Sequence, residues 1–325
     1  MNASAVLQEK NESSEFVATN PEFDRALRDG LRATPKSISP KYFYDERGSR
    51  LFDRICELPE YYPTRTEFSI LEDNAADIAA QIGPRAEIIE FGAGSLTKVR
   101  VLLDALDQPL RFLPIDISGD HLESAAEDLR VDFPHIDVEP IAGDYTRKLD
   151  LPDRVANVGK RVGFFPGSTL GNFKPDEALG FLTRAASLLH GGGLLLGVDL
   201  VKSPKRLHAA YNDAEGVTAQ FNLNLLWRAN RELGADFNLD AFEHYAFYNA
   251  PLQRIEMHLV SRRAQTVTIG DEQFLFGDGE TLHTESSYKF TIEGLSRLAT
   301  QAGFGEGICW TDSKRLFSVN WLPVA

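Results

Sequence analysis

The chain has 325 residues, of which 43% are hydrophobic and 25% are charged, which is ordinary for a globular protein. This length allows one large domain or two of ordinary size. A net charge of −14 argues against nucleic acid or an anionic membrane as the main partner, so the sequence favours a protein that handles small molecules.

Cysteine and histidine are sparse and carry no recognisable pattern. Cys56 and Cys309 are too far apart in sequence to indicate a disulfide framework or a metal site, and the seven histidines lack metal-ligand spacing. We therefore expect no metal. Residues 1–15 are expected to be disordered, and they lack the apolar segment of a signal peptide. No apolar run approaches the roughly 20 residues of a membrane span, so a cytoplasmic protein is expected.

Strands and helices alternate through the middle of the chain. Residues 21–80 have a mostly helical pattern, and the alternation begins at Glu87. Strands are predicted at 88–91, 112–116, 137–141, 161–165 and 194–200, and helices at 98–106, 119–129 (with Ser118 as its cap) and 175–189. This order predicts an α/β fold with a parallel sheet covered by helices on both faces.

The alternation stops after residue 200. Residues 201–233 have a helical pattern, and the alternating strands that follow place Ile255, Met257 and Leu259 on one face. A helix after Thr291 and strands near 308–310 and 316–322 complete the core. We therefore predict an inserted α+β unit that packs with the N-terminal helices. The expected domains are 68–200 with 289–325, and 16–67 with 201–288.

The turn after the first strand carries the clearest functional signal. Glu90 ends an apolar run, and Gly92 and Gly94 follow it, where the absence of side chains lets the backbone approach a ligand. A dinucleotide fingerprint has a third glycine three residues after Gly94, where this chain has Thr97. The turn is therefore more typical of methyltransferases that use S-adenosylmethionine, with a nucleotide-dependent oxidoreductase as an alternative.

Acidic residues stand at or just after the ends of three consecutive predicted strands. Ligands of open α/β sheets bind at these carboxyl ends. Asp116 lies 22 residues after Gly94, a spacing that suits a carboxylate bound to ribose hydroxyls. Asp144 is then placed to accept a hydrogen bond from an adenine amino group, with Tyr145 beside the base.

Longer motifs carry a more specific resemblance. They are YDERGSRLFD at 44–53, LPEYYPTR at 58–65, GSTLGN at 167–172 and GVTAQFN at 216–222. Together they resemble the L-histidine Nα-methyltransferases of ergothioneine biosynthesis, from about residue 20 to the C-terminus. The resemblance implies a Rossmann-like class I methyltransferase core with an inserted substrate-binding domain. It also implies S-adenosyl-L-methionine as cofactor and trimethylation of L-histidine to hercynine.

The resemblance also implies site residues. The cofactor residues are Gly92, Lys98, Asp116, Asp144 and Tyr145. The substrate pocket contains Tyr44, Phe52, Tyr61, Gly167, Asn172, Tyr211, Met257, Glu285, Ser286 and Ser287.

Several of these residues have expected roles. Glu285 and Ser287 are expected to hold the imidazole, and Tyr44 and Tyr211 the α-carboxylate. Asn172 would direct the amine, so that Tyr44 and Asn172 are the expected catalytic residues. Phe52 would stabilise the cationic product.

Three alternatives stay open at this point. They are a methyltransferase of the same family with another amino acid or amine as substrate, a nucleotide-dependent oxidoreductase, and a binding protein without activity. Glu285 and Met257 favour histidine over other substrates, since a different ring would need different partners. No large apolar stripe indicates a dimer, so a monomer is expected.

Overall fold

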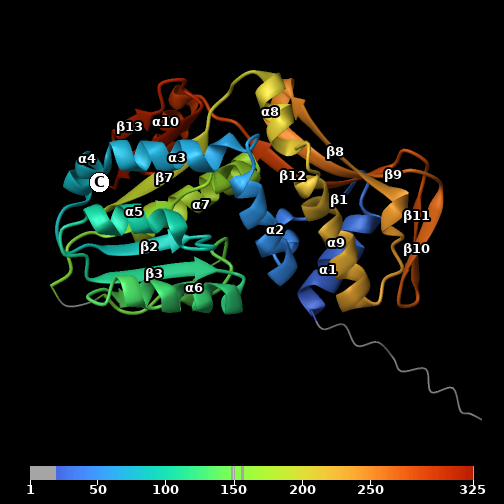
Figure 1. The fold of residues 1–325 in the computed structure, drawn as a ribbon, viewed down its shortest axis with the longest axis horizontal. Coiled ribbons are helices and arrows are strands. Elements are labelled where there is room, and N and C mark those ends of the chain that lie inside the picture. The colour runs from blue at the N-terminus through green and yellow to red at the C-terminus, as the bar shows by residue number, and fades with distance from the viewer. Residues whose placement is uncertain (1–19, 148, 150, 155–156, 325) are drawn as a thin grey trace, which may run out of the picture.

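The computed structural model describes residues 20–147, 149, 151–154 and 157–324, so the predicted disorder of residues 1–15 lies outside the described residues. Figure 1 shows a large sheet with its helices at one end and a smaller sheet with its helices at the other. Within the described ranges, no helix has the length and apolar character needed to cross a membrane.

The large sheet has the order β13-β14-β7-β6-β2-β3-β4, with β5 also paired to β3. Its strands are β2 (Glu87–Phe91), β3 (Arg111–Asp116), β4 (Asp137–Val138), β5 (Ile141–Ala142), β6 (Arg161–Phe165), β7 (Gly193–Asp199), β13 (Ile308–Thr311) and β14 (Phe317–Pro323). The pairs from β4 to β7 are parallel, as predicted, while β14 runs antiparallel to both β7 and β13. The predicted strand 137–141 is interrupted at Pro140, because proline has no N–H for the ladder.

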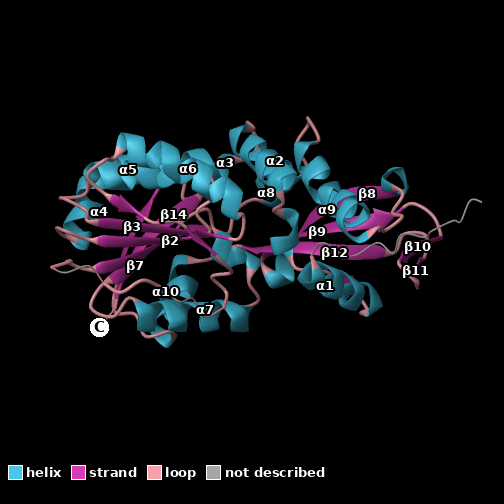
Figure 2. Cartoon of the chain, turned by 90° about the horizontal axis from the view of Figure 1, so that it is seen from below, coloured by secondary structure: helices cyan, strands magenta, loops and turns pink. Residues whose placement is uncertain are grey.

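Helices cover both faces of this sheet, as the alternation predicted (Figure 2). One face carries α3 (Tyr62–Asp73), α4 (Ala75–Ile82), α5 (Thr97–Ala105) and α6 (Gly119–Asp132), and the other carries α7 (Pro175–Leu188) and α10 (Ile292–Gln301). Helix α6 begins after Ser118, but the Ser118 side chain does not cap it. Its hydroxyl donates instead to the carbonyl of Tyr44, 3.2 Å away, and so links the sheet to the N-terminal region.

The smaller sheet has the order β1-β12-β9-β8 and an adjacent hairpin. Its strands are β1 (Lys36–Ser37), β8 (Phe242–Asn249), β9 (Arg254–Ser261) and β12 (Thr281–Tyr288), and the hairpin is β10 (Gln265–Ile269) with β11 (Glu272–Phe276). Ile255, Met257 and Leu259 are buried on one face, as predicted. A register shift between His283 and Glu285 in β12 places Glu285 opposite Met257.

The N-terminal helices share a core with the inserted segment. Besides the smaller sheet, this core contains α1 (Pro21–Arg32), α2 (Glu46–Glu57), α8 (Pro204–Tyr211), α9 (Val217–Leu233) and the short helices η1 (Pro40–Phe43), η3 (Leu239–Ala241) and η4 (Ala250–Leu252). Helix α3 contributes to both cores, with Tyr62 in this one and Ile70 in that of the large sheet. The predicted boundary between residues 67 and 68 therefore falls inside a helix, and the division into two domains stays a prediction.

Candidate active site

The larger of two adjoining cavities lies where the strand order reverses around β2. The chain places β3 on one side of β2 and β6 on the other, and the carboxyl ends of these strands open on a cavity of about 1440 Å³. All predicted cofactor residues line it, namely Gly92, Lys98, Asp116, Asp144 and Tyr145. The topology has thus brought together residues from three strand ends and one helix.

The turn after β2 has the backbone conformation for which the glycines were singled out. Gly92 has φ 68° and Gly94 has φ 55°, in the left-handed region that glycine adopts without strain. A Cβ atom on Gly92 would lie 3.3 Å from the Tyr145 ring. The Gly94 N–H donates to Asp116 Oδ2 at 3.1 Å, and the Ser118 N–H donates to Oδ1 at 2.9 Å. These two bonds fix the Asp116 carboxylate at the edge of the cavity.

Glu90 is buried beside this turn and lines the same cavity. Burial raises the pKa of its carboxyl well above the ordinary value. Its Oε2 atom has no hydrogen-bond partner among the described residues. A carboxyl oxygen that is buried without a partner favours the neutral form of Glu90, in agreement with its raised pKa.

Lys98 is held by a residue that the sequence analysis missed. Its Nζ donates to Glu67 Oε2 at 2.6 Å, and Glu67, fully buried on α3, also accepts from the Gly167 N–H at 2.9 Å. The same carboxylate thus connects α3, α5 and the turn after β6. A single glutamate in an amphipathic helix gives no sequence signal for this role.

Asp144 is ionised and already paired in this structure. Its Oδ1 accepts from the Thr146 N–H at 3.0 Å, and its Oδ2 lies 3.0 Å from Lys41 Nζ. Burial opposes ionisation, but the hydrogen bonds from Thr146 and Lys41 hold the pKa of Asp144 below its ordinary value. Lys41 comes from η1, so this pair joins the N-terminal region to the rim of the larger cavity.

A second, smaller cavity of about 60 Å³ adjoins the first. It is lined by every predicted substrate residue except Ser286, namely Tyr44, Phe52, Tyr61, Gly167, Asn172, Tyr211, Met257, Glu285 and Ser287. Six of these residues, Tyr44, Phe52, Tyr61, Gly167, Asn172 and Glu285, line both cavities. The two cavities therefore share a wall. Asn172 ends η2 (Thr169–Asn172), the short helix that follows β6.

Ser286 lies apart from the other predicted substrate residues because side chains alternate along a strand. It lies opposite Glu256 in the sheet, whereas its neighbours Glu285 and Ser287 face the smaller cavity. Its hydroxyl is 3.1 Å from His283 Nε2 and lines only the larger cavity.

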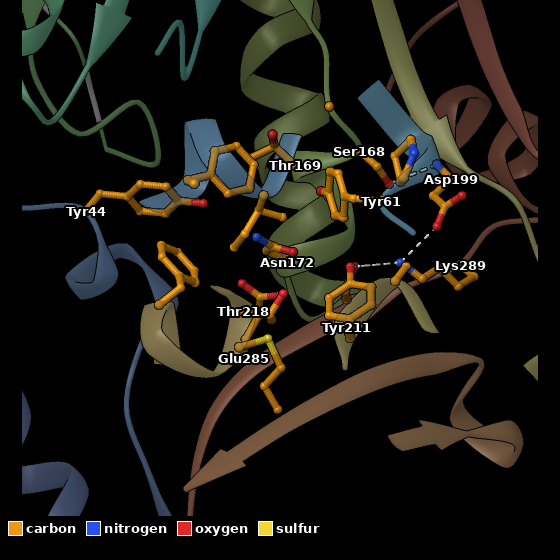
Figure 3. A pocket seen from close by; sticks show the side chains of 18 residues that line it. Tyr44, Tyr61, Ser168, Thr169, Asn172, Asp199, Tyr211, Thr218, Glu285 and Lys289 are labelled. Carbon is orange, nitrogen blue, oxygen red and sulfur yellow. Dashed lines mark hydrogen bonds and ion pairs between the residues drawn. The ribbon is translucent and has the colours of Figure 1, made fainter. Parts of the chain in front are cut away.

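Four polar side chains converge on the smaller cavity without partners, as Figure 3 shows for Tyr44, Tyr61, Asn172 and Glu285. Among the described residues, none makes a hydrogen bond with the side-chain polar atoms of these four. Glu285 is only 8% exposed, and burial raises the pKa of its carboxyl to about 7, although the Lys289 charge opposes this. Such groups are normally satisfied, so this arrangement is that of a binding site for a polar ligand.

A buried network closes one side of the smaller cavity (Figure 3). Lys289 Nζ lies 3.0 Å from Asp199 Oδ2, 2.8 Å from Ser287 Oγ and 3.2 Å from the Tyr211 hydroxyl. The Tyr211 hydroxyl in turn donates to Ser287 Oγ at 2.8 Å. In this arrangement the Tyr211 hydrogen is directed at Ser287, and the predicted contact of Tyr211 with the substrate carboxylate stays a prediction.

The sequence analysis missed both charged members of this network. Asp199 ends β7, so the argument from acidic residues at strand ends applies to it as much as to Asp116. Lys289 follows β12 and is 4% exposed. Nothing in the local sequence distinguishes it from the solvated lysines that are usual at the end of a strand.

Aromatic rings form the remaining wall. The ring of Phe52 lies 5.7 Å from that of Tyr44, 6.3 Å from that of Tyr61 and 6.0 Å from that of Phe221, measured between centroids. Tyr44, Phe52 and Tyr61 line both cavities and Phe221 lines only the smaller one. Aromatic rings of this kind are suitable surroundings for an organic cation.

The chain is similar to known methyltransferases. The structure of the CcbJ methyltransferase from Streptomyces caelestis aligns with 78% of this chain and 90% of that chain, with a TM-score of 0.45 and 17% sequence identity. The histidine N-alpha-methyltransferase of Mycolicibacterium smegmatis is 46% identical over 89% of this chain and 90% of its own length. The histidine N-alpha-methyltransferase of Mycobacterium tuberculosis is 41% identical over 91% of this chain and 93% of its own length.

A family model matches nearly the whole described chain, over residues 23–324, and its description is "Histidine-specific methyltransferase, SAM-dependent". This match excludes the oxidoreductase alternative and accounts for Thr97 in place of a third glycine. The chain belongs to the family of histidine-specific methyltransferases that depend on S-adenosylmethionine.

Proposed function

We propose that this protein transfers methyl groups from S-adenosyl-L-methionine to the α-amino nitrogen of L-histidine, and that three transfers give hercynine for ergothioneine biosynthesis. The observation that carries the proposal is the buried Glu285 carboxylate, unpartnered among the described residues, in a cavity that opens onto the cofactor cavity. A buried carboxylate accepts a strong hydrogen bond from an imidazole N–H. The identity to two histidine N-alpha-methyltransferases supports the same substrate.

The larger cavity fits the cofactor. Gly92 leaves the space that a Cβ would fill, Asp116 offers a fixed carboxylate for ribose hydroxyls, and the Tyr145 ring can lie beside the adenine. Asp144 would accept from the adenine amino group and Lys98 would line the site. Bound there, the cofactor supplies a methyl group that is already activated by its attachment to a sulfonium sulfur.

The protein's contribution is then mainly positioning. Histidine has several nucleophilic nitrogens, so the enzyme must bring the α-amine, and not the ring, toward the methyl group. We assign the imidazole to Glu285 and Ser287, whose side chains face the smaller cavity from the same side of β12. The amine then falls near Asn172 and the α-carboxylate near Tyr44, at the wall that the two cavities share.

The same arrangement explains why the reaction would stop after three transfers. Each transfer needs a neutral amine, so the ammonium formed by the first and by the second transfer must lose a proton before the next one. The trimethylated nitrogen has neither a proton to lose nor a lone pair to react. The growing positive charge would lie against the rings of Phe52, Tyr44 and Tyr61. Cation–π attraction to these rings would keep partly methylated substrates bound for the next transfer.

Mass spectrometry of the products tests this proposal. The protein is incubated with S-adenosyl-L-methionine and a panel of free amino acids and amines, histidine included. We expect mono-, di- and trimethylated histidine to form in succession and no other methylated product. Methylation of another amino acid in preference to histidine would overturn the proposed substrate but leave the cofactor assignment in place.

A further inference from the structure

The hydrogens around Ser287 can be fully counted. The Lys289 ammonium has three N–H donors, and three acceptors surround it, Asp199 Oδ2, Ser287 Oγ and the Tyr211 hydroxyl. The Tyr211 hydroxyl donates its one hydrogen to Ser287 Oγ. Ser287 Oγ thus accepts two hydrogen bonds and has no lone pair left for a third.

This count leaves one hydrogen unassigned, that of the Ser287 hydroxyl. Because both lone pairs of Oγ face Lys289 and Tyr211, the O–H bond must point away from them. Ser287 lines the smaller cavity next to Glu285, so the hydrogen is available to a ligand there. The Ser287 hydroxyl can therefore only donate a hydrogen bond to a ligand in the cavity. The Glu285 carboxylate, two residues earlier, can accept one.

We propose that Lys289 is a positioning residue that, together with Tyr211, fixes Ser287 as a hydrogen-bond donor, so that the pocket selects the neutral imidazole of histidine. The inference rests on the proposed function and deepens it. A neutral imidazole carries one N–H and one bare nitrogen, which match Glu285 and Ser287 respectively. An imidazolium, or a ring without a bare nitrogen, would present nothing for the Ser287 hydrogen to bond.

The surroundings of Lys289 make this arrangement rigid. Lys289 is 4% exposed, and its carboxylate partner Asp199 is 1% exposed. Oδ2 of Asp199, the oxygen that faces Lys289, is in turn held by the hydroxyl of Tyr62 at 2.7 Å. Although burial by itself would lower the pKa of Lys289, Tyr211 and Asp199 raise it above its ordinary value, so the ammonium keeps all three donors.

A double-mutant cycle on histidine binding tests whether Lys289 acts through Ser287. Calorimetry would measure histidine affinity in the presence of S-adenosyl-L-homocysteine for wild type, Ser287→Ala, Lys289→Met and the double variant. Loss of one hydrogen bond to a buried ligand should weaken binding by about 10- to 100-fold. We expect each single variant to lose affinity in this range, and the double variant to lose little more than either single one.

Lys202→Met is the matched control. Lys202 also binds Asp199 and lies 2.7 Å from the Tyr62 hydroxyl, but it makes no contact with Ser287 or Tyr211 among the described residues. We expect nearly wild-type histidine affinity for this variant. If the losses from Ser287→Ala and Lys289→Met multiply in the double variant, or if Lys202→Met costs as much as Lys289→Met, the proposal is overturned.

Ring analogues provide a test that does not depend on the folding of Lys289→Met. Pyrrolylalanine keeps a ring N–H but lacks the bare nitrogen, whereas thiazolylalanine keeps the bare nitrogen and lacks the N–H. Wild type should bind histidine more tightly than either analogue. In Ser287→Ala the difference in affinity between histidine and pyrrolylalanine should disappear, while the difference between histidine and thiazolylalanine should remain. An undiminished preference over pyrrolylalanine would overturn the donor role of Ser287. A wild-type protein that binds no histidine would instead refute the proposed function.

Discussion

Glu285 lowers the stability of the protein and at the same time offers a hydrogen-bond acceptor to a ligand. Its carboxyl is buried in a cavity where no described residue donates to it, so the ionised form is costly in the empty protein. Burial raises its pKa from 4.5 to about 7, against the opposing charge of Lys289. A ligand N–H would remove this cost, which is why the same feature marks the site.

This cost predicts a pH dependence of stability. Between pH 4.5 and 7 the folded protein binds a proton at Glu285 that the unfolded chain does not, so stability falls as pH rises through this window. Glu285→Gln removes that contribution, which amounts to about 3 kcal/mol. The free energies of unfolding of the variant and of wild type are compared by urea unfolding at about pH 5.5 and about pH 8. Relative to wild type, the variant should be more stable at the higher pH than at the lower one. An identical pH dependence of both proteins would contradict the assignment.

The sequence predicts residues best where the signal is local. The glycines after β2, and Asp116 and Asp144 at or after strand ends, could be assigned because a turn and a strand end are each read within a few residues. The Lys289–Asp199 pair joins positions 90 residues apart, and Glu67 reaches Gly167 across 100 residues. Such contacts depend on how helices and strands pack together, and the local sequence pattern carries no information about this packing. The same limit applies to the hydrogen bond between Tyr211 and Ser287, which joins positions 76 residues apart.

At the scale of elements, the β2–α5 turn illustrates two different uses of glycine. Both Gly92 and Gly94 have positive φ, so alanine at either position should cost about 1 kcal/mol of stability. Only the Cβ of Gly92→Ala would contact Tyr145, at 3.3 Å, while that of Gly94→Ala would meet nothing within 4 Å. We therefore expect Gly92→Ala to weaken binding of S-adenosyl-L-homocysteine well beyond Gly94→Ala. Calorimetry that gave equal affinities for the two variants would contradict this reading of the turn.

Helix α3 is the element that connects the two cores. Its buried Glu67 binds Lys98 of α5 and the backbone of Gly167, and removing one partner of a buried ion pair typically costs about 3–5 kcal/mol. Glu67→Ala should lower the free energy of unfolding by this order, whereas Glu72→Ala, exposed on the same helix, should have little effect. Denaturant unfolding compares the two directly. A loss below about 1 kcal/mol for Glu67→Ala would show that the pair does not hold the elements together.

The order of elements was predictable, but their sheet partners were less so. Alternation of apolar runs and helical periods predicted β2 to β7 and their helices within one or two residues, apart from the interruption at Pro140 and from α6, which ends three residues later than predicted. The antiparallel insertion of β14 beside β7 was not predicted, because strand order depends on pairing between distant segments. The monomeric state expected from the sequence stays a prediction.

At the scale of the whole molecule, the two cavities are coupled by shared residues. Tyr44, Phe52, Tyr61, Gly167, Asn172 and Glu285 line both, so a ligand in one cavity completes the wall of the other. Ion pairs between Lys41 of η1 and Asp144 after β5 also join the two regions across the rim. Ordering these residues for one ligand should lower the cost of binding the second.

Each ligand should therefore raise the affinity of the other. Histidine should bind more tightly in the presence of S-adenosyl-L-homocysteine than alone, by about 5- to 100-fold. Because coupling free energy is reciprocal, histidine must raise the affinity for S-adenosyl-L-homocysteine by the same factor. Calorimetric titrations in both orders measure the two factors. Equal factors near one would mean that the shared residues are already rigid in the empty protein. In that case the wall common to both cavities would position the substrates without linking their binding.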